Sequence, residues 1–303
     1  MHERLALIGA PSSAGAYAPG QERAPAALRN VGTPELLEAH GIDVQDRGDV
    51  SGFRWQPDRD NPRAMNAGAV VTVAREVAGQ VATALSEGRD VLVLGGDCTV
   101  EMGTVAGALT RSASTGLVYV DLDTDLNTPD SSQDGALDWM VVSHLLGIEG
   151  TLPELAQVGG RVPLLQPHQV LLFACDNSEA FERDLIDKLA IRRAGLAEVV
   201  AGPAAVAQRT IDGWAKQFEQ LLVHVDVDVL DFVDTPLAEN TRRFYGLTLD
   251  QLLAALGPLL AAPNRVALTV CELNPDHGAE DGSTLRRLAE GLARVLAPSR
   301  LYI

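Results

Sequence analysis

Carboxylate side chains recur in four short clusters of the sequence, and each cluster directly follows an apolar run. The clusters hold Asp97; Asp121, Asp123 and Asp125; Asp226 and Asp228; and Glu272. In an extended segment, a spacing of two residues places the side chains on the same side. Buried carboxylates that repel one another need positive charge, and few basic residues stand near these motifs. Divalent cations are the simplest compensation, and paired carboxylates suit two ions about 3.5–4 Å apart with a nucleophilic water between them.

A different explanation is that these acids are turn and cap residues, because aspartate is common in loops. For a single cluster the two explanations are equally good, but four clusters after four separate apolar runs favour a shared site. In an open α/β sheet, ligands bind just beyond the carboxyl ends of the strands. The clusters would lie at that edge if the apolar runs are strands of one sheet.

The apolar runs are mostly continuous, as expected for strands that are buried on both faces. We expect strands at 5–8, 91–94, 116–120, 170–173, 221–225 and 266–270. Helical spacing of apolar residues predicts helices at 67–85, 211–218, 248–260 and 285–296, and polar or Pro- and Gly-rich stretches predict long loops at 9–25 and 48–62. This alternation predicts a single-domain, three-layer α/β/α protein over residues 1–303, with a mostly parallel central sheet.

The charge of the chain excludes some classes of partner. The 303 residues are 46% hydrophobic and carry a net charge of −17. Nucleic acids and anionic membranes need basic patches, so neither is expected as a partner, whereas an acidic cleft attracts small cationic molecules. The odd and sparse set of Cys98, Cys175 and Cys271 is no disulfide framework and favours a reducing, cytoplasmic setting. No signal peptide and no transmembrane run is expected.

The ordered motifs of the chain resemble those of the ureohydrolase family, which includes arginase and agmatinase. Gly95-Gly96-Asp97-Cys98-Thr99 resembles Gly-Gly-Asp-His-Ser, Asp121 to Asn127 resembles Asp-Ala-His-x-Asp-x-Asn, Val225 to Asp231 is similar to Asp-x-Asp-x-x-Asp-Pro, and Glu272 to Pro275 is similar to Glu-x-Asn-Pro. The opening Ile8 to Ser12 also resembles arginases. Each motif alone is weak, but the ordered set covers residues 5 to 275 and is specific.

The resemblance implies an arginase-like fold and hydrolysis of a guanidino compound to urea and an amine, by hydroxide activated on two manganese ions. By motif position, the implied metal ligands are Cys98, Asp121, Asp123, Asp125, Asp226 and Asp228. The implied catalytic residues are Asp125, Asp138 and Glu272, and the implied substrate-binding residues are Asn127, Ser132 and Glu272. The resemblance also implies a homo-oligomer, a trimer or a hexamer.

Three histidines of the family are missing from this chain. Cys98 and Asp123 replace two metal-binding histidines, and Asp138 falls where arginases carry a proton-shuttling histidine. In addition, Ser178 replaces an acid that helps to recognise the substrate's amino group. With a thiolate and five aspartates, the metal core would be about two charge units more negative than the family's, which weakens the metals as Lewis acids. Cys98 could stay a neutral thiol, one metal could be lost, the thiolate could recruit zinc or iron, or a strongly cationic substrate could restore the balance.

Several interpretations therefore stay open. Cys98 is either a metal ligand or a small buried residue, and His224 either lies behind the metal ligands or packs under a helix. His144 is expected to be a packed or capping residue rather than a substitute shuttle. One hypothesis is a metal-dependent amidinohydrolase that acts on an arginine-like compound or an N-hydroxyguanidine. The other is a catalytically inactive homologue that acts as a binding or structural protein. Hydrolysis of an amide or a formimidoyl group on the same site is a third hypothesis.

Overall fold

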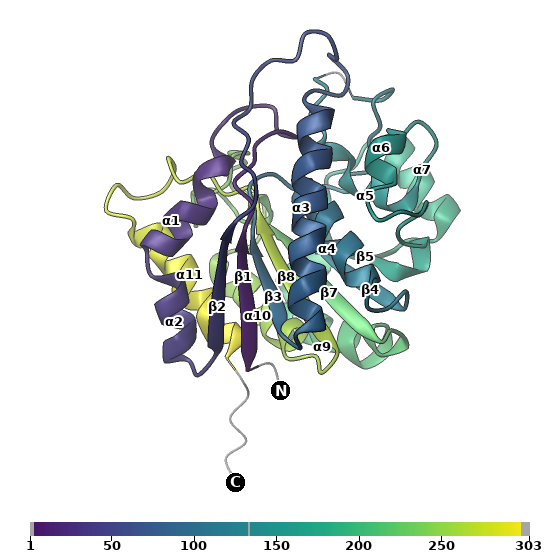
Figure 1. Ribbon diagram of the computed structural model, residues 1–303. Coiled ribbons are helices and arrows are strands. Elements are labelled where there is room, and N and C mark those ends of the chain that lie inside the picture. Colours follow the sequence, from purple (N-terminus) through teal and green to yellow (C-terminus); the bar gives the residue numbers. More distant parts are fainter. Residues whose placement is uncertain (1–2, 133, 298–303) are drawn as a thin grey trace.

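The computed structural model describes residues 3–132 and 134–297, and its centre is one eight-stranded sheet. The strands are β1 Arg4–Gly9, β2 Asp43–Asp49, β3 Asp90–Leu94, β4 Thr115–Val120, β5 Val170–Cys175, β6 Arg192–Gly195, β7 Gln220–Asp226 and β8 Arg265–Cys271. Their order across the sheet is β2-β1-β3-β8-β7-β4-β5-β6, and every described neighbour pair is parallel. The predicted α/β class with a mostly parallel sheet is confirmed (Figure 1).

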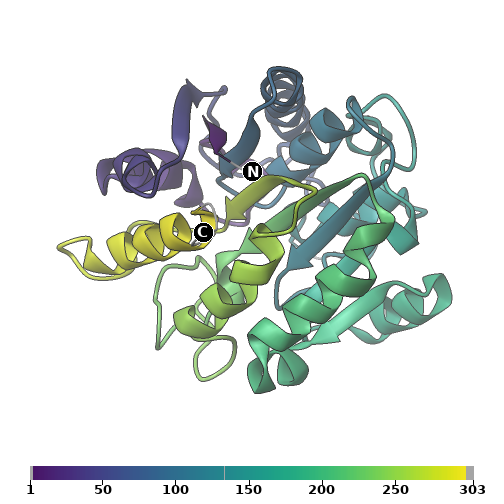
Figure 2. The same ribbon diagram turned by 90° about the horizontal axis from the view of Figure 1, so that it is seen from below.

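The helices cover both faces of the sheet. They are α1 Ala24–Asn30, α2 Thr33–Ala39, α3 Ala67–Ser86, α4 Val100–Leu109, α5 Val141–Leu146, α6 Pro153–Ala156, α7 Ala180–Leu189, α8 Leu196–Ala201, α9 Pro203–Gly213, α10 Leu249–Leu260 and α11 Ser283–Leu296. One core holds side chains of α3 to α7, and the other holds side chains of α1, α2 and α8 to α11. Figure 2 shows helices on both sides of the sheet. Among the described residues, no helix has the length and apolarity needed to cross a membrane.

The six predicted strands are confirmed, and the two that the sequence did not reveal lie at the sheet edges. The edge strand β2 has no buried residue, and its sequence is Asp-Val-Gln-Asp-Arg-Gly-Asp. The other edge strand, β6, buries only Ala194. An edge strand pairs on one side only, so its side chains need not be apolar, and the hydrophobic pattern that marks inner strands is missing.

The predicted helices at 67–85, 248–260 and 285–296 are confirmed to within two residues. The helix predicted at 211–218 is wrong for most of its length, because α9 runs from Pro203 to Gly213 and a short 3-10 turn follows. The apolar residues that suggested a helix, Trp214 and Phe218, instead pack edge to face at 4.9 Å in the core. Their spacing reflects a folded turn rather than one continuous helix.

His144 on α5 is a buried packing residue, as the sequence suggested. Its Nδ1 lies 2.6 Å from the carbonyl of Met140, and its Nε2 accepts a hydrogen bond of 3.1 Å from the Leu152 N–H. The bond to Nε2 requires the neutral ring, because an accepting nitrogen carries no proton, and burial lowers the pKa of His144 to about 4. The unfolded chain therefore binds the additional proton first, so His144 stabilises the fold above about pH 6.5 and loses this contribution as the pH falls towards 4.

Between about pH 6.5 and 4, the free energy of unfolding should fall for both the unsubstituted protein and His144→Asn. We expect the fall to be about 3 kcal/mol larger for the unsubstituted protein. Urea unfolding of both proteins across this range measures the difference. Subtracting the pH profile of the variant cancels the contribution of the acids that titrate in the same range. Parallel pH profiles for the two proteins would show that His144 is not held neutral by the fold.

Candidate metal centre

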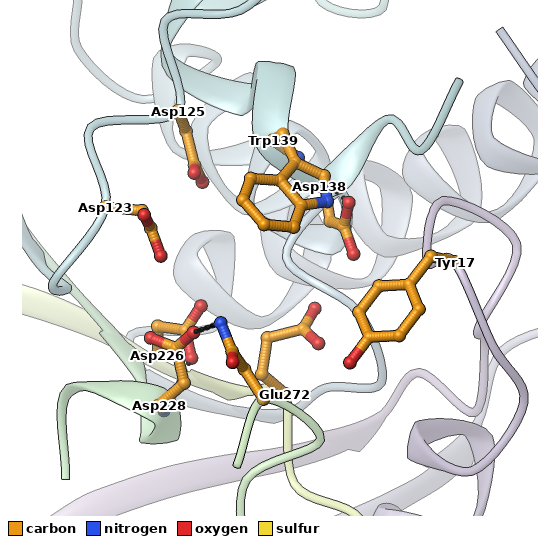
Figure 3. A pocket seen from close by; sticks show the side chains of 9 residues that line it. Tyr17, Asp123, Asp125, Asp138, Trp139, Asp226, Asp228 and Glu272 are labelled. Atoms are coloured by element: carbon orange, nitrogen blue, oxygen red, sulfur yellow. Dashed lines mark hydrogen bonds between the residues drawn. The ribbon is translucent and has the colours of Figure 1, made fainter. Parts of the chain in front are cut away.

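The four acidic clusters meet at the carboxyl edge of the sheet. They follow β3, β4, β7 and β8, and β8 lies between β3 and β7. A small cavity of about 30 Å³ opens there, enough for one or two water molecules. It is lined by Tyr17, Asp123, Asp125, Asp138, Trp139, Asp226, Asp228, Asn240 and Glu272 (Figure 3). The tertiary structure thus brings carboxylates from three of the four clusters into one acidic cavity.

The turn after β3 contains two glycines, Gly95 and Gly96. The backbone of Gly96 lies against the Ser12 loop, and a Cβ atom on Gly96 would sit 1.8 Å from the Ser12 carbonyl oxygen. The Asp97 N–H donates to that same carbonyl at 2.8 Å, and the Gly96 carbonyl accepts from the Glu272 N–H at 2.8 Å. Only glycine permits this approach, which fixes the positions of Cys98 and Glu272 relative to the sheet.

Three aspartates form one candidate metal site, which we call the aspartate group: Asp121, Asp123 and Asp228. Each offers a carboxylate oxygen, and these oxygens all lie within 4.8 Å of one another. Asp121 Oδ2 and Asp228 Oδ1 are buried without a hydrogen-bond partner among the described residues. Buried carboxylate oxygens without a donor need a cation, so the group fits a hard divalent ion such as Mn²⁺.

Arg242 supplies positive charge that the sequence did not reveal. Its Nη1 lies 2.8 Å from Asp123 Oδ2, and its Nη2 donates to Asp123 Oδ1 at 3.2 Å. Asn177 also donates to Asp123. Few basic residues lie near the acids in the sequence, but the fold brings Arg242 beside Asp123 from 119 residues away. The expectation that no side chain compensates these acids is therefore wrong. With one cation fixed beside Asp123, the expected excess of about two negative charges falls to about one.

Burial and mutual repulsion shift the carboxyl groups of the cavity. The pKa of Asp121 is raised well above its ordinary value, first by burial and then by the charges of Asp226, Asp125 and Asp228. Burial and the charge of Asp123 raise the pKa of Asp228 to about 7. Protons and metal ions therefore compete for these oxygens, and we expect metal binding to release protons.

The remaining predicted oxygen ligands have protein partners. Asp125 has a positive φ of 49° and accepts a hydrogen bond from the Tyr119 hydroxyl. Asp226 Oδ1 accepts from the Asp228 N–H at 2.8 Å, and Asp226 Oδ2 accepts from Cys98 Sγ at 3.1 Å. Asp226 therefore lies between the aspartate group and Cys98, a position from which one carboxylate reaches both.

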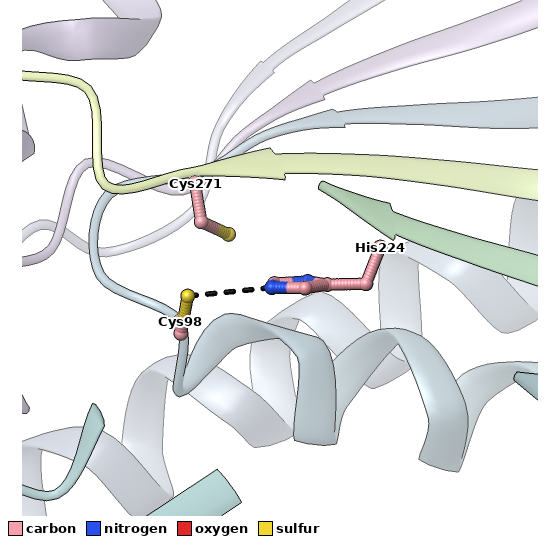
Figure 4. Close-up of side chains that lie close together, drawn as sticks. All are labelled: Cys98, His224 and Cys271. Atoms are coloured by element: carbon pink, nitrogen blue, oxygen red, sulfur yellow. Dashed lines mark hydrogen bonds between the residues drawn. The ribbon is translucent and has the colours of Figure 1, made fainter. Parts of the chain in front are cut away.

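A second cluster of ligand-type side chains, which we call the thiol–imidazole group, consists of Cys98, His224 and Cys271. The three side chains are at most 1% exposed, and their ligand atoms lie within 4.8 Å of one another (Figure 4). The His224 ring stacks on Tyr119 with centroids 4.2 Å apart. His224 thus lies beside the predicted ligand Cys98 and also against α4 through Glu101, so both interpretations of His224 describe part of its setting. The sequence analysis had given Cys271 no role at the site.

The expected substrate-binding residues separate into two places. Glu272 lines the cavity, and its carboxylate accepts from the Cys98 N–H at 2.8 Å and from Gln21 Nε2 at 3.1 Å. Asp138 also lines the cavity, and its Oδ1 accepts from the Trp139 N–H at 2.9 Å.

Asn127 and Ser132 are not among the residues that line the cavity. Asn127 accepts from the Ser131 hydroxyl at 2.9 Å, and the Ser132 hydroxyl donates to Asp134 at 2.9 Å. Asn127 also donates to Glu182 on α7 at 3.4 Å, so the described partners of both side chains lie outside the cavity lining.

Glu182 holds the loop that carries the aspartates, and sequence reasoning missed it. It is buried at the start of α7, and its Oε1 accepts from the Thr124 hydroxyl at 2.7 Å and from the Leu126 N–H at 3.2 Å. Its Oε2 accepts from the Glu179 N–H at 2.7 Å. The capping-box spacing Glu179 to Glu182 before a helix was a usable signal for the helix start, but not for the contact with the loop.

We expect Glu182→Gln to lower the free energy of unfolding by about 1–3 kcal/mol, because an amide NH₂ must replace one of two oxygens that both accept hydrogen bonds. We also expect weaker metal binding, since the loop that holds the aspartates loses an anchor. Urea unfolding and metal titration measure the two effects. The exposed Glu149→Gln is the matched control and should change neither. Wild-type behaviour of Glu182→Gln would contradict the anchoring role.

Comparisons with known proteins agree with this architecture. Residues 3–297 match the model of the Arginase family. The chain is 28% identical to the arginase of Bacillus caldovelox over 274 residues, which is 89% of this chain and 91% of that protein. It is also 28% identical to human arginase-1 over 296 residues, covering 97% and 92% of the two chains. The solved structure of the Bacillus caldovelox arginase superposes with a TM-score of 0.87 at 25% identity, covering 99% and 100%. The chain belongs to the arginase family.

Proposed function

We propose that the protein is a metal-dependent amidinohydrolase that releases urea, or a substituted urea, from a small cationic guanidino compound. The observation that carries this proposal is the aspartate group, whose two unpartnered buried oxygens lie beside a cavity with carboxylates on several sides. Its relatives named arginase support the same class of reaction. The fit of the group to a hard cation supports Mn²⁺ as the first metal to test.

The residues that would hold the metal ions are those of the aspartate group, with Asp226 and Asp125 beside them. Bound divalent ions supply Lewis acidity and a water of lowered pKa. The protein itself provides an acidic floor, and Asp226 is oriented by hydrogen bonds from the Asp228 N–H and Cys98 Sγ. The hydrogen bond from Tyr119 fixes Asp125 in the same way.

The opposite wall of the cavity has side chains of the kinds that bind a guanidinium group. The Glu272 carboxylate is held by the Cys98 N–H and by Gln21, so it points to a defined position on the cavity wall. The rings of Trp139 and Tyr17 lie beside it and can pack against a planar cation (Figure 3). Asp138 is buried nearby, and its pKa is raised by burial and then by the charge of Glu272, so it can carry a proton at the cavity.

The test is a urea and hydroxyurea assay on protein loaded separately with Mn²⁺, Zn²⁺, Fe²⁺ or Ni²⁺. The substrates are arginine-like guanidino compounds and N-hydroxyguanidines, with formimidoyl compounds and amides in parallel. Product from a guanidino compound is expected. Glu272→Gln should lower kcat/KM by about 10- to 100-fold, because a charge-assisted hydrogen bond contributes about 1.5–3 kcal/mol. The exposed Glu290→Gln is the control and should leave kcat/KM unchanged.

No product from any guanidino compound with any of the metals would overturn the proposal. Turnover of a formimidoyl compound or an amide alone would move the chain to a different hydrolytic substrate. If the protein binds guanidino compounds without turnover, the inactive homologue with a binding role becomes the correct description.

A further inference from the structure

We propose that Cys98, His224 and Cys271 form a metal site of their own, suited to a soft divalent cation such as Zn²⁺ and distinct from the aspartate group. The three residues come from the turn after β3, from β7 and from the end of β8. Only Cys98 belongs to the motifs that the chain shares with ureohydrolases, where it replaces histidine. His224 and Cys271 each stand one position before such a motif. The motifs on which the resemblance rests therefore do not account for this donor set.

One separation in the thiol–imidazole group is close to that expected for a tetrahedral zinc site. Cys98 Sγ lies 3.3 Å from His224 Nε2, and the sulfur of Cys271 belongs to the same cluster. Tetrahedral zinc, with bonds of about 2.3 Å to sulfur and 2.0–2.1 Å to nitrogen, holds those two atoms about 3.6 Å apart. Figure 4 shows both sulfur atoms directed towards the same edge of the imidazole.

The far side of His224 is arranged as in metal-binding histidines. Its Nδ1 lies 3.5 Å from Glu101 Oε2, and both side chains are fully buried. Neither oxygen of Glu101 nor Nδ1 of His224 has a hydrogen-bond partner among the described residues. A histidine that binds metal through one nitrogen usually donates its other N–H to a carboxylate. Glu101 is such a carboxylate, and it lies fully buried beside Nδ1 of His224, in the position that this arrangement requires.

Asp226 supplies a fourth position and a route to the cavity. Its Oδ2 lies 3.1 Å from Cys98 Sγ, and its side chain lines the cavity. Two thiolates and one neutral imidazole balance the charge of Zn²⁺, so the buried site would be neutral before Asp226 is counted. Thiolates select soft ions and carboxylates select hard ions. The chain would thus sort two different metals into adjacent groups, whether or not it hydrolyses guanidino compounds.

The test uses Co²⁺ alone as a spectroscopic probe of the full-length, metal-free, reduced protein. Binding to the thiol–imidazole group gives thiolate-to-cobalt charge-transfer absorption in the near ultraviolet, and Zn²⁺ should abolish it on displacing the cobalt. Cys98→Ser and Cys271→Ser should each remove most of this absorption. Cys175→Ser is the matched control, because Cys175 is also buried but lies on β5, away from the group. It should leave the absorption unchanged.

Two further variants separate this site from its surroundings. Glu101→Gln should lower zinc affinity by about 10- to 100-fold while keeping all three ligands. Asp228→Asn should weaken Mn²⁺ binding at the aspartate group and keep the cobalt absorption. Circular dichroism confirms that each variant is folded. These readouts do not require catalysis, so failure of the proposed function leaves them intact.

Absence of charge-transfer absorption in the reduced wild-type protein would overturn the proposal without reference to any variant. Absorption that persists in both Cys98→Ser and Cys271→Ser would also overturn it. A Cys98–Cys271 disulfide in the isolated protein, combined with no zinc uptake after reduction, would show that the group is a redox pair or a dry packing cluster instead.

Discussion

Asp121→Asn is expected to lower metal-dependent turnover by about 10³-fold and, at the same time, to stabilise the metal-free protein. Loss of one ligand from the aspartate group removes several kcal/mol of transition-state stabilisation, and each factor of ten corresponds to about 1.4 kcal/mol. The amide keeps the oxygen that accepts from the Asp123 N–H at 2.8 Å. Steric change is therefore small, and the effect on turnover reports the lost charge.

The gain in stability follows from the raised pKa of Asp121 in the folded protein. The folded state holds the proton more tightly than the unfolded state, so the carboxyl costs nothing below its unfolded pKa of about 3.9 and destabilises the fold increasingly as the pH rises. Asparagine removes this cost, which we place at about 1–4 kcal/mol. Urea unfolding in the presence of a chelator should show a larger gain at about pH 8 than at about pH 5.

The exposed Asp130→Asn is the control for both measurements. It removes the same charge from the surface and should leave turnover and stability within about 0.5 kcal/mol of the parent. If Asp121→Asn destabilised the metal-free protein, the Asp121 carboxylate would be stabilised by a positively charged side chain of the fold. If it left turnover unchanged, the aspartate group would not be the site of the reaction.

Gly96→Ala is expected to lower the free energy of unfolding by about 4 kcal/mol or more and to abolish metal binding at both groups. The added Cβ would lie 1.8 Å from the Ser12 carbonyl oxygen and 2.7 Å from the Ser12 carbonyl carbon. Both contacts are with backbone, so no side-chain rotation relieves them. The loop must move, and it carries Cys98 and positions Glu272 through the hydrogen bond between Gly96 and the Glu272 N–H.

Thermal unfolding and metal titration of Gly96→Ala measure the two effects, and Gly79→Ala is the matched control. Gly79 lies on the exposed side of α3, and a Cβ there meets nothing within 4 Å. Alanine should therefore stabilise that helix by about 1 kcal/mol. A folded Gly96→Ala protein with normal metal binding would show that the Ser12 loop does not set the geometry of the site.

The sequence by itself determined the inner sheet and the location of the acids. Continuous apolar runs such as 116–120 indicated buried strands, and the acids after them indicated the carboxyl edge of a parallel sheet. These inferences succeeded because they depend on residues that are neighbours along the chain, where periodicity is visible. The polar edge strands and the turn at Trp214 lack such periodicity or imitate a different one, so they were missed.

Only the tertiary structure decided how the charges and the ligand atoms are grouped. The pairing of Arg242 with Asp123 spans 119 residues, and the contact of Cys98 with His224 spans 126. Cys271 entered the thiol–imidazole group because β8 lies beside both β3 and β7. The physical reason is that these contacts arise from strand order and side-chain direction across the sheet, neither of which leaves a local pattern in the sequence.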